Sequence, residues 1–310
     1  MGVGILLLLG ATQLVVIVLN KMEKHRFGPV FLGTLVTPLC TGYPNLMIGL
    51  FGQERLQGDL VLQLNIGNNL ANTSLITGLV LFAAGPLMTR PGKGNSKKAK
   101  KANMDQFLAL LFLWLGAVLL FFTARDGAVS RMDGLALAGI YLLYQLISYS
   151  RQGKASPSKR MGASTVLLLI LLLAAAAWLI QLSVNLLGQS MEHLGHLFPG
   201  AHLAMFLGLL TVIPESFLLL RLALQKGSLG FSGLVGDCLV SVPLVIGLSA
   251  MFFPFQTPAV HGWGEAARPY LHLLITMVAF TLLSFAKAPV RKPVGLLFMA
   301  MYGVIWWFSR

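Results

Sequence analysis

Apolar stretches of membrane-spanning length recur from one end of this 310-residue chain to the other, and they restrict its fold more than any other feature. Roughly 20 consecutive apolar residues cross the hydrocarbon core of a bilayer as a helix. Charged residues make up only 11% of the chain, against about 25% in an ordinary soluble domain. A water-soluble chain of this length would need the charged surface that is missing here. The sequence therefore predicts an all-α integral membrane protein.

Ten membrane-spanning helices are predicted from the apolar stretches. They cover residues 2–20, 29–51, 59–88, 105–123, 132–150, 163–187, 201–225, 229–254, 268–286 and 292–308. The third span contains a polar run, Gln63 to Thr73, where a bend or a break is expected. The connectors are short and are basic or rich in glycine and proline, so no separate soluble domain is expected.

The positive charge lies mainly on one side of the predicted membrane. Seventeen Lys and Arg residues fall in the odd-numbered connectors and five on the opposite side, with Arg221 inside a span. The positive-inside rule then places the odd-numbered connectors in the cytoplasm and both termini outside, in the plasma (inner) membrane. The run from Lys97 to Lys101 is predicted to be a solvated loop facing anionic lipid headgroups, and no nucleic-acid partner is expected.

An internal repeat connects two distant pairs of spans. Residues 41–45, Thr-Gly-Tyr-Pro-Asn, resemble residues 211–215, Thr-Val-Ile-Pro-Glu. A second polar run follows each of them, Gly67 to Asn72 in one copy and Gly236 to Ser241 in the other. The glycine that opens each run lies eleven residues before another glycine, and the gap from the proline to the opening glycine is 23 residues in one copy and 22 in the other.

The two copies are separated by an odd number of spans, so they are predicted to cross the membrane in opposite directions. We expect two inverted five-helix halves, residues 1–150 and 163–310, joined by a basic cytoplasmic connector at 151–162. A proline frees a backbone carbonyl that hydrocarbon cannot satisfy, so such a break persists where it lines a cavity or coordinates a ligand. The oxygen-rich side chains around both breaks suit hard cations such as Na⁺ and Ca²⁺.

These runs resemble the two α-repeats of the calcium/cation antiporter superfamily, the group that contains the sodium/calcium exchangers. Each repeat of that family reads roughly Gly-Thr-Ser-x-Pro-Glu, then Gly-Ser-Asn-x-x-Asn, and closes on a glycine. The matching residues are Thr41, Pro44, Gly67, Asn69, Asn72 and Gly78 in the first copy and Thr211, Pro214, Glu215, Gly236 and Gly247 in the second. The resemblance implies a secondary antiporter rather than an enzyme, which needs no cofactor and exchanges Ca²⁺ for Na⁺ or H⁺ by alternating access.

The chain departs from the family pattern at positions that bear on ion binding. The first copy has Asn45 where the family has a glutamate, and the second has Asp237 and Cys238 in place of the Ser-Asn pair. The two mid-membrane carboxylates, Glu215 and Asp237, then both belong to the second copy. Two negative charges balance one Ca²⁺ or two Na⁺, so the ion pair and its stoichiometry stay open.

Eight residues are predicted to bind the transported cations. Glu215 and Asp237 are expected to be metal ligands, because an unpaired carboxylate in a span costs at least ~2.5 kcal/mol. Neutral oxygens are expected from Asn45, Asn68, Asn72, Thr41, Thr211 and Ser241. The alternatives are interhelical hydrogen bonds for the asparagines, a helix cap for the aspartate and backbone hydrogen bonds for the threonines. A salt bridge to Arg221 is not expected, because six residues of helix turn it away from Glu215.

Two further hypotheses remain open at this stage. The outward connector before the seventh span, with the start of that span, contains Glu192, His193, His196 and His202. Solvated histidines are expected there, and the alternatives are a zinc site or a pH-sensitive gate. The alternative to antiport is a membrane scaffold or sensor that keeps the fold with a degenerate ion site, which Asn45 favours. Inorganic cations and the lipid bilayer are the expected partners of a monomeric chain.

The predicted topology can be tested by labelling. In a chain whose two cysteines are replaced by alanine, Lys97→Cys should react with a membrane-impermeant maleimide only after cell lysis, because residues 90–104 are expected in the cytoplasm. The matched variant Arg125→Cys, in an outward connector, should react in intact cells. Labelling of position 97 from outside intact cells would contradict the topology.

Overall fold

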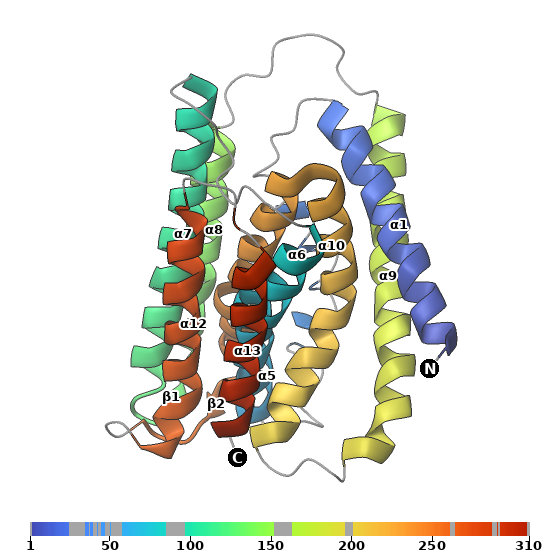
Figure 1. The fold of residues 1–310 in the computed structure, drawn as a ribbon. Coiled ribbons are helices and arrows are strands. Elements are labelled where there is room, and N and C mark those ends of the chain that lie inside the picture. Colours follow the sequence, from blue (N-terminus) through green and yellow to red (C-terminus); the bar gives the residue numbers. More distant parts are fainter. Residues whose placement is uncertain are drawn as a thin grey trace.

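The chain is helical almost throughout the residues that the computed structural model describes, and its helices run side by side (Figure 1). The described residues are 2–24, 35–36, 38–39, 42, 45–46, 50, 58–84, 97–151, 163–195, 201–260, 264–286, 290 and 292–308. Within them, three segments have the length and hydropathy to cross a membrane, namely Ala99–Thr123, Ser164–Leu182 and Ser232–Phe252. Two shorter helices, Arg268–Ser284 and Lys292–Phe308, are also apolar.

The described helices follow the order of the predicted spans, apart from the second span, which lies largely outside the described residues. They are α1 (Gly2–Lys24), α5 (Gly58–Ala71), the π-helix η2 (Asn72–Ile76), α6 (Thr77–Ala84), α7 (Lys97–Thr123), α8 (Arg131–Arg151), α9 (Ala163–Gly195), α10 (Ala201–Leu239), the π-helix η3 (Val240–Ile246), α11 (Gly247–Phe252), the 3₁₀-helix η4 (Glu265–Ala267), α12 (Arg268–Ser284) and α13 (Lys292–Phe308). Two short strands, β1 (Ala128–Val129) and β2 (Phe255–Gln256), pair in antiparallel fashion and join the connectors after α7 and α11.

The lysine run forms the first turns of α7 and is not the loop that the sequence predicted. The helix begins at Lys97, eight residues before the predicted start of its span, and Lys97, Lys100 and Lys101 are exposed. Lysine is a good helix former, and its long stem lets the ammonium group reach water beyond the hydrocarbon. The helix therefore continues past the apolar stretch that defined the predicted span.

Three of the four acidic and histidine residues singled out near the seventh span also fall in helices rather than in a connector. α9 extends to Gly195 and so contains Glu192 and His193, while His202 lies in the first turn of α10. His196 lies outside the described residues. No proline interrupts the sequence of α9 before residue 199, so the helix can extend beyond its apolar part.

Helix α10 contains the predicted seventh span and the first part of the eighth, and it doubles back on itself. A Cβ atom at Gly233 would collide with the side chain of Leu219, although a straight helix would hold these two residues roughly 21 Å apart. Figure 1 shows α10 turning over at the upper end of the molecule. Its two arms therefore lie side by side, as the separate predicted spans 201–225 and 229–254 require.

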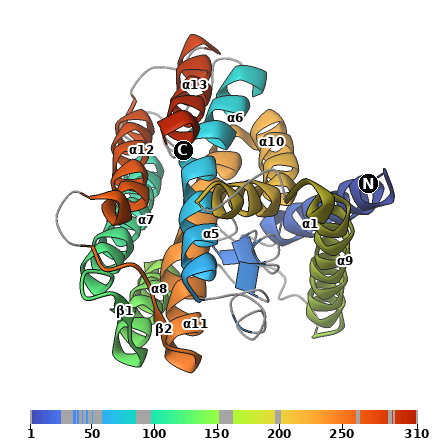
Figure 2. The same ribbon diagram turned by 90° about the horizontal axis from the view of Figure 1, so that it is seen from below.

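The polar runs of the repeat lie at the centre of the helix bundle. Figure 2 shows α5 in the middle, with α7, α8, α12 and α13 on one side and the pair α1 and α9 on the other. The apolar window in Ser232–Phe252 is 89% buried, whereas that in Ser164–Leu182 is only 17% buried. The outer face of α9 exposes large apolar side chains such as Leu171 and Trp178, as expected of a helix that faces lipid.

Two close helix crossings flank this centre, and each is made by a pair of glycines. A Cβ at Gly78 on α6 would lie 2.6 Å from the carbonyl oxygen of Gly295 on α13. A Cβ at Gly134 on α8 would lie 2.6 Å from the carbonyl oxygen of Gly247 on α11. Small residues let helix backbones approach closely in membranes, so each crossing depends on the missing side chains.

The crossings predict which glycines the fold needs. Gly295→Ala and Gly134→Ala should each lower the free energy of unfolding by about 1–3 kcal/mol, because the added methyl group meets backbone atoms that cannot move aside. The matched controls lie on the same helices: Gly303→Ala and Gly139→Ala, where no described atom beyond the adjacent backbone of the same helix lies within 4 Å of the new methyl group. The measurement is thermal unfolding in detergent, and equal shifts for test and control variants would refute the packing argument.

Candidate cation-binding site

Two π-helical segments lie at the polar runs of the repeat. η2 connects α5 to α6 and begins at Asn72, and η3 connects α10 to α11 and contains Pro243. π-Helical turns are rare and occur frequently at functional sites. The wider turn is visible at Thr77, whose Oγ1 donates to the carbonyl oxygen of Asn72, five residues earlier, over 2.7 Å. The expected bend or break in the third span is thus a widened turn within a continuous helical segment.

A hydrogen bond between buried side chains joins the two polar regions. Asn72 Nδ2 donates to Oε2 of Glu215 over 2.9 Å and lies 3.1 Å from Oδ1 of Asn68. Glu215 is 0% exposed, and the buried residues of the described chain include no Lys, Arg or His. The carboxylate is therefore stabilised by a neutral amide, and the alternative salt bridge to Arg221 is not formed.

Asn68 connects three helical segments. Its Nδ2 donates to Thr211 Oγ1 on α10 over 3.2 Å, and its Oδ1 accepts from Ser241 Oγ on η3 over 3.0 Å. The close approach of α10 to α5 depends on Gly208, where a Cβ would lie 2.7 Å from the backbone nitrogen of Asn68. The glycine therefore brings the first arm of α10 against the polar run of α5.

The second carboxylate, Asp237, lies next to a contact between the same helices. Asn69 Nδ2 donates to the carbonyl oxygen of Cys238 over 3.2 Å. Asp237 is 1% exposed and lies four residues, about one helical turn, before Ser241, whose hydroxyl bonds Asn68 in the network around Glu215. The two carboxylates therefore belong to one buried polar region.

Several buried oxygen atoms of this region accept no hydrogen bond from the described residues. They include Oε1 of Glu215, Oδ1 of Asn69, Oδ1 of Asn72 and Oδ1 of Asn45, whose Nδ2 has no partner among the described residues either. Buried polar atoms normally have partners, and carboxylate and amide oxygens are the ligands that hard cations prefer. No cluster of three or more His, Cys, Asp or Glu side chains occurs among the described residues. The donor set suits Na⁺ or Ca²⁺ rather than zinc.

The structure unites five of the eight predicted ligands in one hydrogen-bonded network, formed by Asn68, Asn72, Thr211, Glu215 and Ser241. Asp237 is buried in the same region. Asn45 is also buried, at 1% exposed, but no hydrogen bond joins its side chain to Glu215. Thr41 lies outside the described residues.

Sequence reasoning missed two polar contributors to this region. Asn69 matched the repeat pattern but was not counted as a ligand, although its Nδ2 bonds the second copy. Thr276 on α12 accepts a hydrogen bond from Thr73 on η2 over 2.9 Å. A single threonine in an apolar helix gives no signal in the sequence, whereas the match of Asn69 to the repeat could have identified it.

Comparison with known proteins identifies the family of this chain. A family model described as sodium/calcium exchanger protein matches residues 1–150 and 166–310. The chain is similar to the inner membrane protein YrbG of Escherichia coli (strain K12), with 23% identity over 329 residues, which cover 99% of this chain and 96% of that protein.

The fold is similar to that of the sodium-calcium exchanger NCX_Mj. Its structure soaked with 2.5 mM Na⁺ and 1 mM Sr²⁺ superposes with a TM-score of 0.75 at 16% identity, over 97% of this chain and 94% of that one. Its structure soaked with zero Na⁺ and Ca²⁺ gives 0.72 at 17% identity, over 99% and 96%. The family match covers nearly the whole sequence, so the chain belongs to the sodium/calcium exchanger protein family, a family of membrane transporters rather than enzymes.

Proposed function

We propose that this protein exchanges Ca²⁺, or another divalent cation, for Na⁺ or H⁺ at the buried centre around Asn72 and Glu215. The Glu215 carboxylate carries the proposal. It is 0% exposed, one of its oxygens accepts from Asn72, and the other has no hydrogen-bond partner among the described residues. A charge is costly within the bilayer, so a transmembrane carboxylate is by default a functional group. A bound cation would supply the opposite charge.

Alternating access between two inverted halves, residues 1–150 and 163–310 with a connector at 151–162, is the proposed mechanism. Two observations support it. The π-helices η2 and η3 begin within one residue of corresponding positions in the two polar runs. The glycine that closes each run also packs on a glycine in the last helix of the other half, Gly78 on Gly295 and Gly247 on Gly134. Transporters with such repeats move one part against the other around a site near the bilayer midplane.

Charge balance favours a particular stoichiometry. Glu215 and Asp237 are the buried carboxylates of the described residues. We propose that they bind the cation directly, with neutral oxygens from Asn45, Asn68, Asn72, Thr41, Thr211 and Ser241. A loaded site costs least inside the bilayer when its net charge is near zero. One divalent cation would then exchange for two monovalent cations, without net movement of charge.

A second candidate function is a non-transporting membrane scaffold or sensor of the same fold. Asn45 favours it, because the family pattern has a glutamate at this position. The buried network around Glu215 favours transport, since a scaffold gains nothing from an unneutralised carboxylate that an apolar side chain could replace.

Removal of the Glu215 charge distinguishes the two candidates. Glu215→Gln should lower ⁴⁵Ca²⁺ uptake into proteoliposomes, driven by an outward Na⁺ or H⁺ gradient, by at least about ten-fold. The fold should persist, because the amide has the same shape and its oxygen can still accept from Asn72. The control Asp126→Asn removes the same charge from an exposed loop and should transport normally. A wild-type chain that shows no gradient-driven flux of Ca²⁺ would favour the scaffold, and full activity of Glu215→Gln would place the ion site elsewhere.

A third buried carboxylate should change the ratio in which the cations are exchanged. Wild-type uptake should be insensitive to a membrane potential set with K⁺ and valinomycin, because the proposed exchange moves no net charge. Asn45→Glu adds a negative charge to a buried position, so balance would require a further monovalent cation and the exchange should become sensitive to the potential. The measurement is initial uptake rate against imposed potential. Strong dependence on the potential in the wild type would overturn the stoichiometry while leaving the antiport proposal intact.

A further inference from the structure

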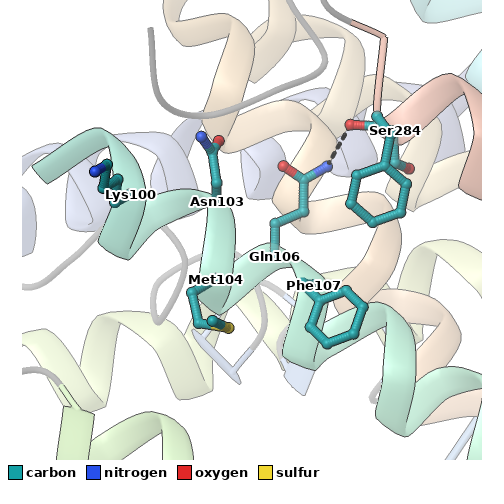
Figure 3. Close-up of a pocket in the computed structure, with 7 residues that line it drawn as sticks. Lys100, Asn103, Met104, Gln106, Phe107 and Ser284 are labelled. Atoms are coloured by element: carbon teal, nitrogen blue, oxygen red, sulfur yellow. Dashed lines mark hydrogen bonds between the residues drawn. The ribbon is translucent and has the colours of Figure 1, made fainter. Parts of the chain in front are cut away.

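A cavity of about 430 Å³ lies where the start of α7 meets the end of α12 (Figure 3). Lys100, Asn103, Met104 and Phe107 line it from α7, and Ser284 and Phe285 line it from the end of α12. Gln106, a further lining residue, reaches from α7 to the other wall, where its Nε2 donates to the Ser284 carbonyl oxygen over 3.3 Å. The cavity is thus held between two helices that a buried side chain ties together.

The wall formed by α7 changes from charged to apolar along one face of the helix. Lys100, Met104, Phe107 and Leu111 follow one another at intervals of three or four residues, so they share a face. All of them are exposed, Met104 at 48%, Phe107 at 45% and Leu111 at 41%. This sequence of a cationic group followed by an apolar surface matches the order of phosphate and acyl chain in a phospholipid.

The opposite wall continues the apolar surface. The ring of Phe285 lies 6.4 Å from that of Phe107, measured between centroids, and is 41% exposed. Two turns deeper on α7, Trp114 Nε1 donates to Thr281 Oγ1 on α12 over 2.9 Å. The helices are therefore joined below the cavity, while apolar side chains from both walls stay accessible at its mouth.

We propose that this cavity binds an anionic phospholipid, with the lipid phosphate at Lys100 and Asn103 and an acyl chain along Met104 and Phe107. A volume of this size falls within the usual range of small-molecule sites, about 300–1,000 Å³. It takes the headgroup and the first part of the acyl chains, and the remaining chain length lies on the exposed apolar face of α7.

The charges around the cavity select an anionic lipid over a zwitterionic one. Lys97 and Lys101 are exposed on the same turns as Lys100, and Asp105 forms an ion pair with Arg151 on α8 at 2.8 Å. The acidic group of this segment is thus neutralised away from the cavity. In the predicted topology this end of α7 faces the cytoplasm, whose leaflet carries anionic lipids that attract juxtamembrane lysines.

The test is native mass spectrometry of the purified full chain in a neutral detergent. It is titrated with palmitoyl-oleoyl phosphatidylglycerol, with the phosphatidylcholine of the same chains, or with inorganic phosphate. Phosphatidylglycerol should bind more tightly than phosphatidylcholine, and Lys100→Gln should weaken its binding about five-fold. The control Lys101→Gln removes the same charge from a neighbouring position that does not line the cavity, so it should weaken binding by less than about two-fold.

Three outcomes would overturn the proposal. Equal losses in the two lysine variants would mean that the lipid senses only the general positive charge of the segment. Equal binding of both phospholipids would mean ordinary solvation of an apolar face. Displacement of the lipid by inorganic phosphate at equal concentration would indicate a site for a free anion. A second variant, Phe107→Ser, tests the apolar part and should weaken phosphatidylglycerol binding while leaving the lysines intact.

Discussion

The hydrogen bond between Asn72 and Glu215 is the interaction around which the rest of this protein is arranged. Hydrocarbon offers no partner to a carboxylate, so a buried glutamate requires polar groups from its own chain. Asn72 supplies one of these groups, and Asn68 extends the polar chain to Thr211 and Ser241. The network can form only if α5, η2, α10 and η3 lie side by side at the centre of the bundle. The lipid-facing helices, such as α9, can then be almost entirely apolar.

Glycine makes that arrangement sterically possible. Gly208 lets α10 approach the backbone of Asn68. The pair Gly78–Gly295 brings α6, which follows η2, against α13, and the pair Gly134–Gly247 brings α11, which follows η3, against α8. The outer helices also reach the centre directly. Gly116 on α7 leaves room for the ring of Pro243 in η3, and Thr276 on α12 accepts from Thr73 in η2. Of the two helices that form the proposed lipid site, α7 therefore touches η3 and α12 touches η2. A lipid held between these helices would bear on the spacing around the proposed ion site.

The sequence predicted the fold class and the central polar region, because both follow from constraints that act locally. Apolar length defines a span, and a polar run inside a span must face the protein interior. Helix ends were harder, since hydrogen bonding within a helix does not stop at the edge of the apolar region, as α7 and α9 illustrate. η2 was anticipated only as a bend or a break in the third span, because nothing in a polar run distinguishes a widened turn from a break. η3 in the eighth span was not anticipated. Contacts such as that of Thr276 depend on which helices become neighbours, and hydropathy does not contain that information.

The first copy of the repeat places asparagines at the centre and the second copy places the two carboxylates there, and hydrogen-bonding chemistry explains this difference. In the proposed inverted arrangement, Asn68 corresponds to Asp237 and Asn72 to Ser241, so the first copy has an amide where the second has a carboxylate or a hydroxyl. Amides donate as well as accept, and this lets Asn72 and Asn69 bond Glu215 and the carbonyl of Cys238 without adding charge. A carboxylate at those positions would accept only, and it would place a further negative charge beside Glu215 in a medium of low dielectric constant. An asparagine-rich first half therefore stabilises a second half that holds the carboxylates. In the proposed function, cation binding then depends on two carboxylates, and these limit the number of cations that can be neutralised there.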